Sequence, residues 1–188
     1  MRCISFFRTL FLSAVILLCA GAAVAAEPGD AAAALRDKTA TGSGTLRFLG
    51  VPIYDAILFS SSGADLRRFE AHPLALELTY RRALKGAAIA ERSLKEMADQ
   101  GPIDPPRATR WLAQMTAAFP DVNPGDRLLG THHPVTGARF YFNGRLKASI
   151  DDAEFSRRFF AIWLSPQTSQ PGLRDALLSG PRPVIGAR

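Results

Sequence analysis

The order of strand-like and helix-like segments restricts the fold of this chain more than any other feature of its sequence. Large apolar residues alternate with polar or small ones over residues 74–80, which predicts a β-strand. Gly86 marks a change to helical spacing, and amphipathic helices are predicted over residues 87–99 and 109–119. This part of the chain therefore contains one strand followed by two helices.

Strand-like segments lie on both sides of this part. Residues 45–48 and 51–59 predict two strands. Pro52 inside the second indicates a sheet edge or a bulge, because proline lacks the N–H that a ladder needs. Asn143-Gly144 lies between two later strands and is the strongest short signal for a hairpin turn. The strands predicted after the two helices cover residues 127–131, 138–142 and 146–150.

Two further helices are predicted near the end of the chain. The first starts at Asp151, which forms a capping-box-like pair with Glu154, and the second covers residues 171–178. The first of these helices has a broad apolar face formed by Phe155, Phe159, Phe160, Ile162 and Trp163. Because strands and helices are segregated along the chain, we expect an α+β fold in which an antiparallel sheet is packed by helices on one side.

The first 25 residues have the composition of a secretory signal peptide. Arg2 and Arg8 are its charges, an apolar core covers residues 10–18, and small residues end at an A-x-A site near Ala25. We therefore predict export to the periplasm, cleavage after Ala25, and no membrane span in the remaining chain. The predicted division is a signal peptide over 1–25, a linker over 26–40, one domain over 41–180 and a C-terminal tail over 181–188.

Cysteine and histidine usage limits the chemistry of the exported chain. Both cysteines, Cys3 and Cys19, lie in the predicted signal peptide, so we expect no disulfide, no thiol nucleophile and no cysteine-ligated metal. His132 and His133 are adjacent, and adjacent residues of a strand point to opposite faces. We therefore predict neither a metal site nor another cofactor.

The chain is basic, with 23 Lys+Arg against 17 Asp+Glu and a formal net charge of +6. Loss of Arg2 and Arg8 with the signal peptide lowers this charge to +4, because no acidic residue is lost with them. The remaining basic residues are scattered among acidic ones, which is typical of a solvated mixed surface. We therefore do not expect nucleic acid as a partner.

Motifs of common enzyme classes are absent from the sequence, which has no G-x-S-x-G, no G-x-G-x-x-G and no P-loop. Arg47 and Tyr54 stand out instead, since both lie in otherwise apolar strand segments. If the bend at residues 50–52 folds these strands together, guanidinium and phenol can meet and bind a carboxylate or an enolate. The pattern equally fits Arg47 facing solvent and Tyr54 packing in the core.

Several segments of the chain carry a resemblance to a known family. They are GTLRFLGVPIYDAILF (44–59), LALELTYRR (74–82), IAERSLKEM (89–97), the segment 111–122, FYFNG (140–144) and FFAIWLSPQTSQPGLRDALL (159–178). In this order they resemble exported bacterial members of the chalcone isomerase-like family, over roughly residues 41–180. The resemblance implies an open-faced β-sandwich: a large antiparallel sheet packed by a layer of helices, with a cleft between them.

The resemblance also implies roles for particular residues. In plant chalcone isomerases an arginine of the cleft steadies a phenolate or enolate, whereas in fatty-acid-binding relatives an arginine and a tyrosine bind a carboxylate. Arg47 matches the family arginine, and Tyr54 falls where the isomerases have threonine and the fatty-acid binders have tyrosine. Ile89 and Glu96 occupy the places of a catalytic tyrosine and asparagine, and the segment near Ile162 lacks a small hydroxyl residue that the isomerases have.

These matches predict a non-catalytic periplasmic protein that binds a fatty acid or similar amphipathic carboxylate through Arg47 and Tyr54. One alternative is an intramolecular lyase that isomerises a chalcone-like conjugated ketone. A second is a structural or interaction protein whose cleft is filled by its own aromatic side chains. The observation that separates them is whether Arg47 and Tyr54 face one apolar cavity.

Overall fold

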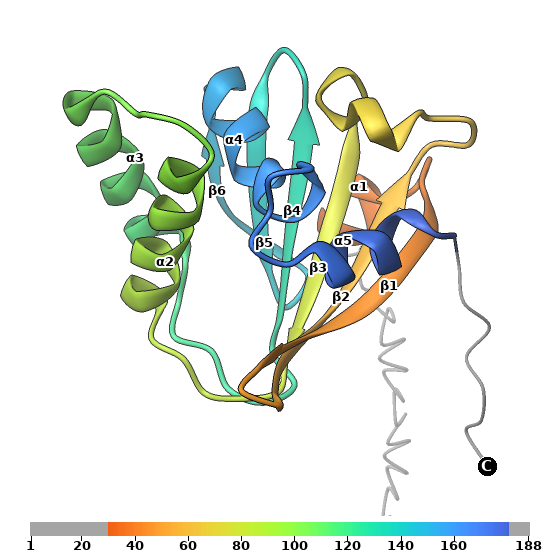
Figure 1. Cartoon of the computed structure of the whole chain (residues 1–188), viewed down its shortest axis with the longest axis horizontal. Coiled ribbons are helices and arrows are strands. Elements are labelled where there is room, and N and C mark those ends of the chain that lie inside the picture. Colours follow the sequence, from red (N-terminus) through yellow and green to blue (C-terminus); the bar gives the residue numbers. More distant parts are fainter. Residues whose placement is uncertain (1–29, 181–188) are drawn as a thin grey trace, which may run out of the picture.

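One antiparallel sheet forms the centre of the computed structural model, which describes residues 30–180 (Figure 1). Its strands lie in the same order in the sheet as in the sequence, and each pairs antiparallel with the next. They are β1 (Thr39–Phe48), β2 (Val51–Ser60), β3 (Leu74–Tyr80), β4 (Arg127–His133), β5 (Gly137–Phe142) and β6 (Arg145–Ile150). The predicted α+β fold with a large antiparallel sheet is confirmed.

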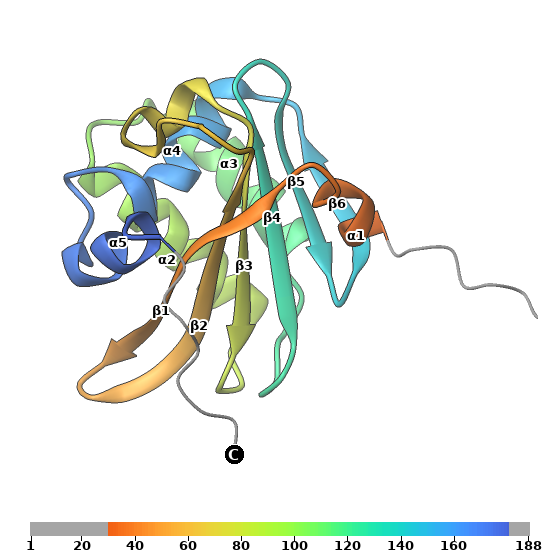
Figure 2. The ribbon, with the colours of Figure 1, turned by 90° about the vertical axis from the view of Figure 1, so that its right-hand side faces the viewer.

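Helices cover the two faces of the sheet very unequally (Figures 1 and 2). One face carries α2 (Gly86–Asp99), α3 (Pro105–Ala118), α4 (Ala153–Leu164) and α5 (Pro171–Leu178). The 3-10 helix η1 (Leu66–Ala71) lies between β2 and β3 in the chain. The short helix α1 (Asp30–Ala34) lies on the opposite face, where Ala31 and Ala34 pack against a small cluster of Ala75, Leu129 and Tyr141.

Some boundaries differ from those predicted from sequence. Residues 30–40 do not form a linker: they form α1 and the start of β1, because α1 finds apolar partners on the outer face of the sheet. Helix α3 starts at Pro105 instead of residue 109. Its first turn is fixed by Asp104, whose carboxylate accepts a hydrogen bond from the backbone N–H of Arg107 at 3.1 Å.

Helix α4 is capped one residue later than the sequence predicted. The carboxylate of Asp152, and not that of Asp151, accepts from the backbone N–H of Phe155 at 3.0 Å. The other oxygen of the same carboxylate accepts from Trp111 Nε1 of α3 at 2.9 Å. One aspartate therefore caps α4 and fixes α3 beside it, which holds the aromatic face of α4 over the sheet.

The main core lies between the sheet and the helical layer. Leu74, Leu76 and Leu78 of β3 all point to this side, as the alternating pattern predicts. Gly130 of β4 lies under α4, and a Cβ atom at this position would come within 3.1 Å of the Phe160 ring. The absence of a side chain there lets the aromatic helix approach the sheet closely.

The turn between β5 and β6 has the backbone conformation that its sequence predicts. Asn143 (φ 47°) and Gly144 (φ 89°) both have positive φ, so the predicted hairpin turn is confirmed. The predicted signal peptide and the predicted tail over 181–188 lie outside the described residues. Within residues 30–180, no helix is long and apolar enough to cross a membrane. Among the described residues, the main core is formed by side chains between Leu46 and Leu178, and a chain that begins at Ala26 contains all of these.

Candidate ligand-binding site

An apolar cavity of about 250 Å³ lies between the sheet and helices α2 and α4. Strands β1, β2 and β3 form its floor, α2 and α4 form its opposite walls, and the α4–α5 connection closes one side. Apolar side chains dominate the wall, among them Leu46, Ile53, Leu78, Ile89, Phe159 and Ile162. A cavity of this kind suits the hydrocarbon part of a ligand.

Two tyrosines bring hydroxyl groups to this apolar wall. Tyr54 of β2 and Tyr80 of β3 are paired across the strands, and their rings meet edge to face with centroids 5.9 Å apart. The Tyr54 oxygen accepts a hydrogen bond from Trp163 Nε1 at 2.9 Å, so its own proton remains free to be donated. Burial raises the pKa of both phenols, which keeps them neutral donors at physiological pH.

Tyr80 differs from Tyr54 in its hydrogen bonding. Its side chain is buried, yet within the described residues its hydroxyl has no hydrogen-bond partner. The hydroxyl oxygen has access to the open space of the cavity, where water or a ligand can satisfy it. The floor of the cavity therefore offers two phenolic donors, of which at least one is unsatisfied by the protein itself.

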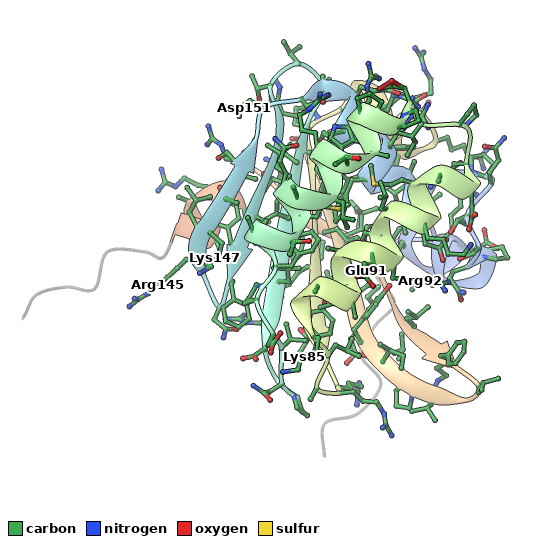
Figure 3. The ribbon with its side chains drawn as sticks, turned by 90° about the vertical axis from the view of Figure 1, so that its left-hand side faces the viewer. Lys85, Glu91, Arg92, Arg145, Lys147 and Asp151 are labelled. Atoms are coloured by element: carbon green, nitrogen blue, oxygen red, sulfur yellow. The ribbon has the colours of Figure 1, made fainter. Side chains whose placement is uncertain are left out.

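A charged pair lies on the α2 side of the cavity. Arg92 and Glu96, one helical turn apart, form an ion pair, and Ser169 Oγ donates to the same Glu96 oxygen at 3.0 Å. The Glu96 side chain is 9% exposed and that of Arg92 is 62% exposed, so the pair runs from the interior to the surface. Figure 3 shows Arg92 on the side of α2 toward the β1–β2 hairpin. Within the part of the chain that the structure describes, only one of the five N–H donors of its guanidinium has a protein partner.

The two residues singled out in the sequence lie in different places. Tyr54 lines the cavity, whereas Arg47 is exposed, donates to the Gly50 carbonyl at 3.2 Å and is not part of the cavity wall. Register explains this difference: Leu46 is the partner of Tyr54, and Arg47 lies past a bulge, opposite Pro52. Within the described residues, the predicted meeting of guanidinium and phenol is therefore not formed.

Sequence reasoning passed over Arg92, Tyr80 and Ser169 as site residues. A signal for the charged pair was present, because Glu96 lies two helical turns after Ile89 and so shares the buried face of α2. Ile89 and Glu96 both line the cavity. A carboxylate on an apolar helix face is the kind of residue that needs a partner.

The aromatic residues of α4 fill only part of the space under the helical layer. Phe155 and Phe160 are fully buried in the core, while Phe159 and Trp163 form part of the cavity wall. The alternative of a cleft filled by its own aromatic side chains is met only in part: these side chains fill the centre of the layer and leave a cavity beside α2, and Arg47 does not line that cavity.

The adjacent histidines point to opposite faces of the sheet, as predicted. His133 is exposed, whereas His132 is 2% exposed and its Nδ1 lies 2.6 Å from Ser156 Oγ. Among the residues that the structure describes, no group of three or more His, Cys, Asp or Glu side chains could hold a metal ion. His132 therefore belongs to the packing of α4 on the sheet.

Burial of His132 predicts a loss of stability in mild acid. Burial lowers the pKa of His132 below its usual value of 6.5, so below that pH the unfolded chain binds a proton that the folded chain resists. The free energy of unfolding should fall as pH decreases from 7 toward 5, by at most about 1.4 kcal/mol per pH unit. Urea unfolding at a series of pH values measures this. The His132→Phe/Ser156→Ala variant should lose the His132 part of the dependence, and an unchanged slope would contradict the prediction.

With this geometry established, the chain can be placed in a family. The model of the chalcone isomerase-like family matches residues 41–179, which is most of the chain. The chain therefore belongs to the chalcone isomerase-like family, as its sequence motifs predicted.

Two individual proteins are similar to this chain. An uncharacterized protein of Haemophilus influenzae is 30% identical over 126 residues, which are 67% of this chain and 60% of that protein. The chain thus spans less than two thirds of that relative's length. The crystal structure of a fatty-acid binding protein of Arabidopsis thaliana superposes with a TM-score of 0.56 at 10% identity, over 76% of this chain and 87% of the other. At this identity the superposition shows a shared fold.

Proposed function

We propose that this protein is a non-catalytic periplasmic protein that binds a fatty acid or a similar amphipathic carboxylate. The observation that carries the proposal is the shape of the cavity: an apolar wall with hydroxyl groups on its floor and a partly exposed guanidinium at its side. An acyl chain gains by leaving water for such a wall, and a carboxylate gains from charge-assisted hydrogen bonds. The fold shared with a fatty-acid binding protein supports the same ligand class.

In this proposal the ligand carboxylate lies between Tyr54 and Arg92. Arg92 and Glu96 line the same cavity as Tyr54, and both charges act on the pKa of the Tyr54 hydroxyl: Glu96 raises it and Arg92 lowers it. Arg92 keeps most of its donors for a second acceptor while one holds Glu96, and a guanidinium commonly serves two carboxylates. Glu96 then acts as the fixed partner that positions Arg92 at the cavity.

The wall supports binding better than isomerisation. The family resemblance implies that Ile89 falls where the isomerases have a catalytic tyrosine; Ile89 lines the cavity, and an aliphatic side chain can neither donate nor accept a proton. The volume of about 250 Å³ also lies just below the range of about 300–1,000 Å³ that is usual for small-molecule sites. We therefore expect a ligand with one medium-length chain, or a longer chain whose end leaves the cavity.

Titration calorimetry of residues 26–188 with hexanoic, decanoic and hexadecanoic acid tests the proposal, with decanol as the uncharged match for decanoic acid. Arg92→Gln should weaken the acid by about tenfold and leave the alcohol nearly unchanged, since only the acid uses the guanidinium charge. The double variant Arg92→Gln/Glu96→Gln removes both charges, so no unpaired carboxylate is left at position 96. It should likewise weaken binding of the acid by about tenfold and leave binding of the alcohol nearly unchanged. Absence of binding by all three acids would sink the proposal.

Arg47→Gln is the matched control, because it removes the same charge from a residue outside the cavity wall. We expect it to leave the affinity for decanoic acid unchanged. If Arg47→Gln weakens the acid and Arg92→Gln does not, the carboxylate is bound at the residue that the family resemblance indicated, and the assignment to Arg92 is wrong.

A further inference from the structure

The turn between β1 and β2 exposes three apolar side chains around one glycine. Phe48 is 64% exposed, Leu49 88% and Val51 36%, and Gly50 lies between the last two. This hairpin projects beyond the other strands at one end of the sheet (Figures 1 and 2). Single exposed apolar residues are common, but a cluster at a projecting tip marks a surface that contacts an apolar partner.

The backbone of this turn adds a second observation. Leu49 (φ 50°) and Gly50 (φ 80°) both have positive φ, the conformation of a two-residue hairpin turn. Asparagine, aspartate or glycine normally occupies the first position of such a turn, because a leucine side chain is strained there. The strain at Leu49 is not offset by packing within the described chain, since its side chain is almost fully exposed.

The charges around the tip are positive. Arg47 is exposed and donates a hydrogen bond to the Gly50 carbonyl. The backbone N–H of Arg81 donates to the Ile53 carbonyl at 2.8 Å, which brings the next residue, Arg82, alongside the end of the hairpin. Within the described residues neither Arg47 nor Arg82 has an acidic partner.

Asp55 is the acidic residue of β2 closest to the tip, and an ion pair compensates its charge. The carboxylate of Asp55 accepts from Thr45 Oγ1 and forms an ion pair with Arg81, each at 2.7 Å. The end of the hairpin therefore combines uncompensated positive charge with exposed apolar side chains, and it offers no free carboxylate to repel an anion.

We propose that the β1–β2 tip, residues 47–51, docks this protein on an anionic phospholipid bilayer. The apolar side chains of the tip would enter the interface between headgroups and acyl chains, and Arg47 and Arg82 would lie at the level of the phosphates. A narrow convex tip suits a fluid bilayer better than another folded protein, because a stable protein interface needs a broad complementary surface. This inference rests on the hairpin and the neighbouring Arg82, and it does not depend on the proposed ligand.

Docking in this way would also orient the cavity. Leu46 and Ile53, on the two strands of the same hairpin, line the cavity wall just behind the tip. A docked hairpin therefore places that side of the cavity next to the bilayer, from which an amphipathic molecule could enter without crossing water.

Sedimentation of residues 26–188 with unilamellar vesicles tests the docking surface. One set of vesicles contains phosphatidylglycerol and phosphatidylethanolamine, and the other contains phosphatidylcholine alone. We expect binding to the anionic set to be at least tenfold stronger. The Phe48→Ser/Leu49→Asn/Val51→Thr variant should lose at least a further tenfold. Asparagine tolerates positive φ, so this variant should fold at least as well as the parent chain, and unfolding in urea checks that it does.

Val135→Asn is the matched control. Val135 is 78% exposed in the β4–β5 turn, at the end of the sheet opposite the β1–β2 tip (Figure 1). Its replacement should leave vesicle binding unchanged. The proposal is overturned if the parent chain does not bind anionic vesicles, or if the triple variant binds them as well as the parent. Self-association in solution that the triple variant abolishes, without vesicle binding, would instead assign the tip to contact between copies of the chain.

Discussion

Replacing Phe155 by alanine is expected to lower the free energy of unfolding by about 3–5 kcal/mol, because it opens a cavity that the core cannot close. Phe155 is fully buried where α3, α4 and the sheet meet. Its ring lies 5.6 Å from the rings of Trp111 and Phe159 and 6.3 Å from that of Phe140. Urea unfolding followed by circular dichroism at neutral pH measures the change.

Phe48→Ala is the matched control for this substitution, since the same atoms are removed from a side chain that is 64% exposed. We expect it to change stability by no more than about 0.5 kcal/mol. Phe155 does not line the cavity, so the folded Phe155→Ala protein should keep its affinity for decanoic acid. Equal losses of stability in the two variants would show that Phe155 is not a central contact of the core.

The helices and strands could be predicted because their signals are local. Alternation over Leu74–Tyr80 and the Asn143-Gly144 turn each depend on neighbouring residues, and both match the structure. The start of α3 was predicted late because its apolar stripe begins after the cap. Asp104 and Pro105, rather than the first apolar residue, determine where the helix begins.

The side of the sheet on which Arg47 lies could not be predicted from sequence, because it depends on the register between β1 and β2. The turn at Leu49-Gly50 makes Leu46, and not Arg47, the cross-strand partner of Tyr54, and neighbouring strand residues face opposite sides. A resemblance can match an arginine and a tyrosine to a family without specifying this register. The side of the sheet that each occupies depends on a turn and a bulge of single residues.

The polar side of the cavity depends on contacts between distant parts of the chain. Ser169 donates to Glu96 across 73 positions of sequence, and Trp163 donates to Tyr54 across 109. Neither contact leaves a local pattern. Only the position of Glu96 on the buried face of α2 indicated that a polar partner had to approach from elsewhere.

Replacing Ala88 by tryptophan is expected to have the largest effect on ligand binding. Ala88 is exposed near the start of α2 and also lines the cavity, so a large side chain there can enter the space that the ligand would use without disturbing buried residues. We expect the affinity for decanoic acid to fall by at least about thirtyfold, which corresponds to about 2 kcal/mol. Titration calorimetry with residues 26–188 measures the loss.

Ala87→Trp separates this effect from the general cost of tryptophan in a helix. Ala87 is the neighbouring exposed residue of the same helix and does not line the cavity, so the two variants share the same change in helix propensity. Ala87→Trp should therefore bind decanoic acid as the parent chain does, with both variants equally stable in urea. If Ala88→Trp and Ala87→Trp bind decanoic acid equally well, a large side chain in the cavity does not disturb the ligand. The ligand would then lie outside this cavity.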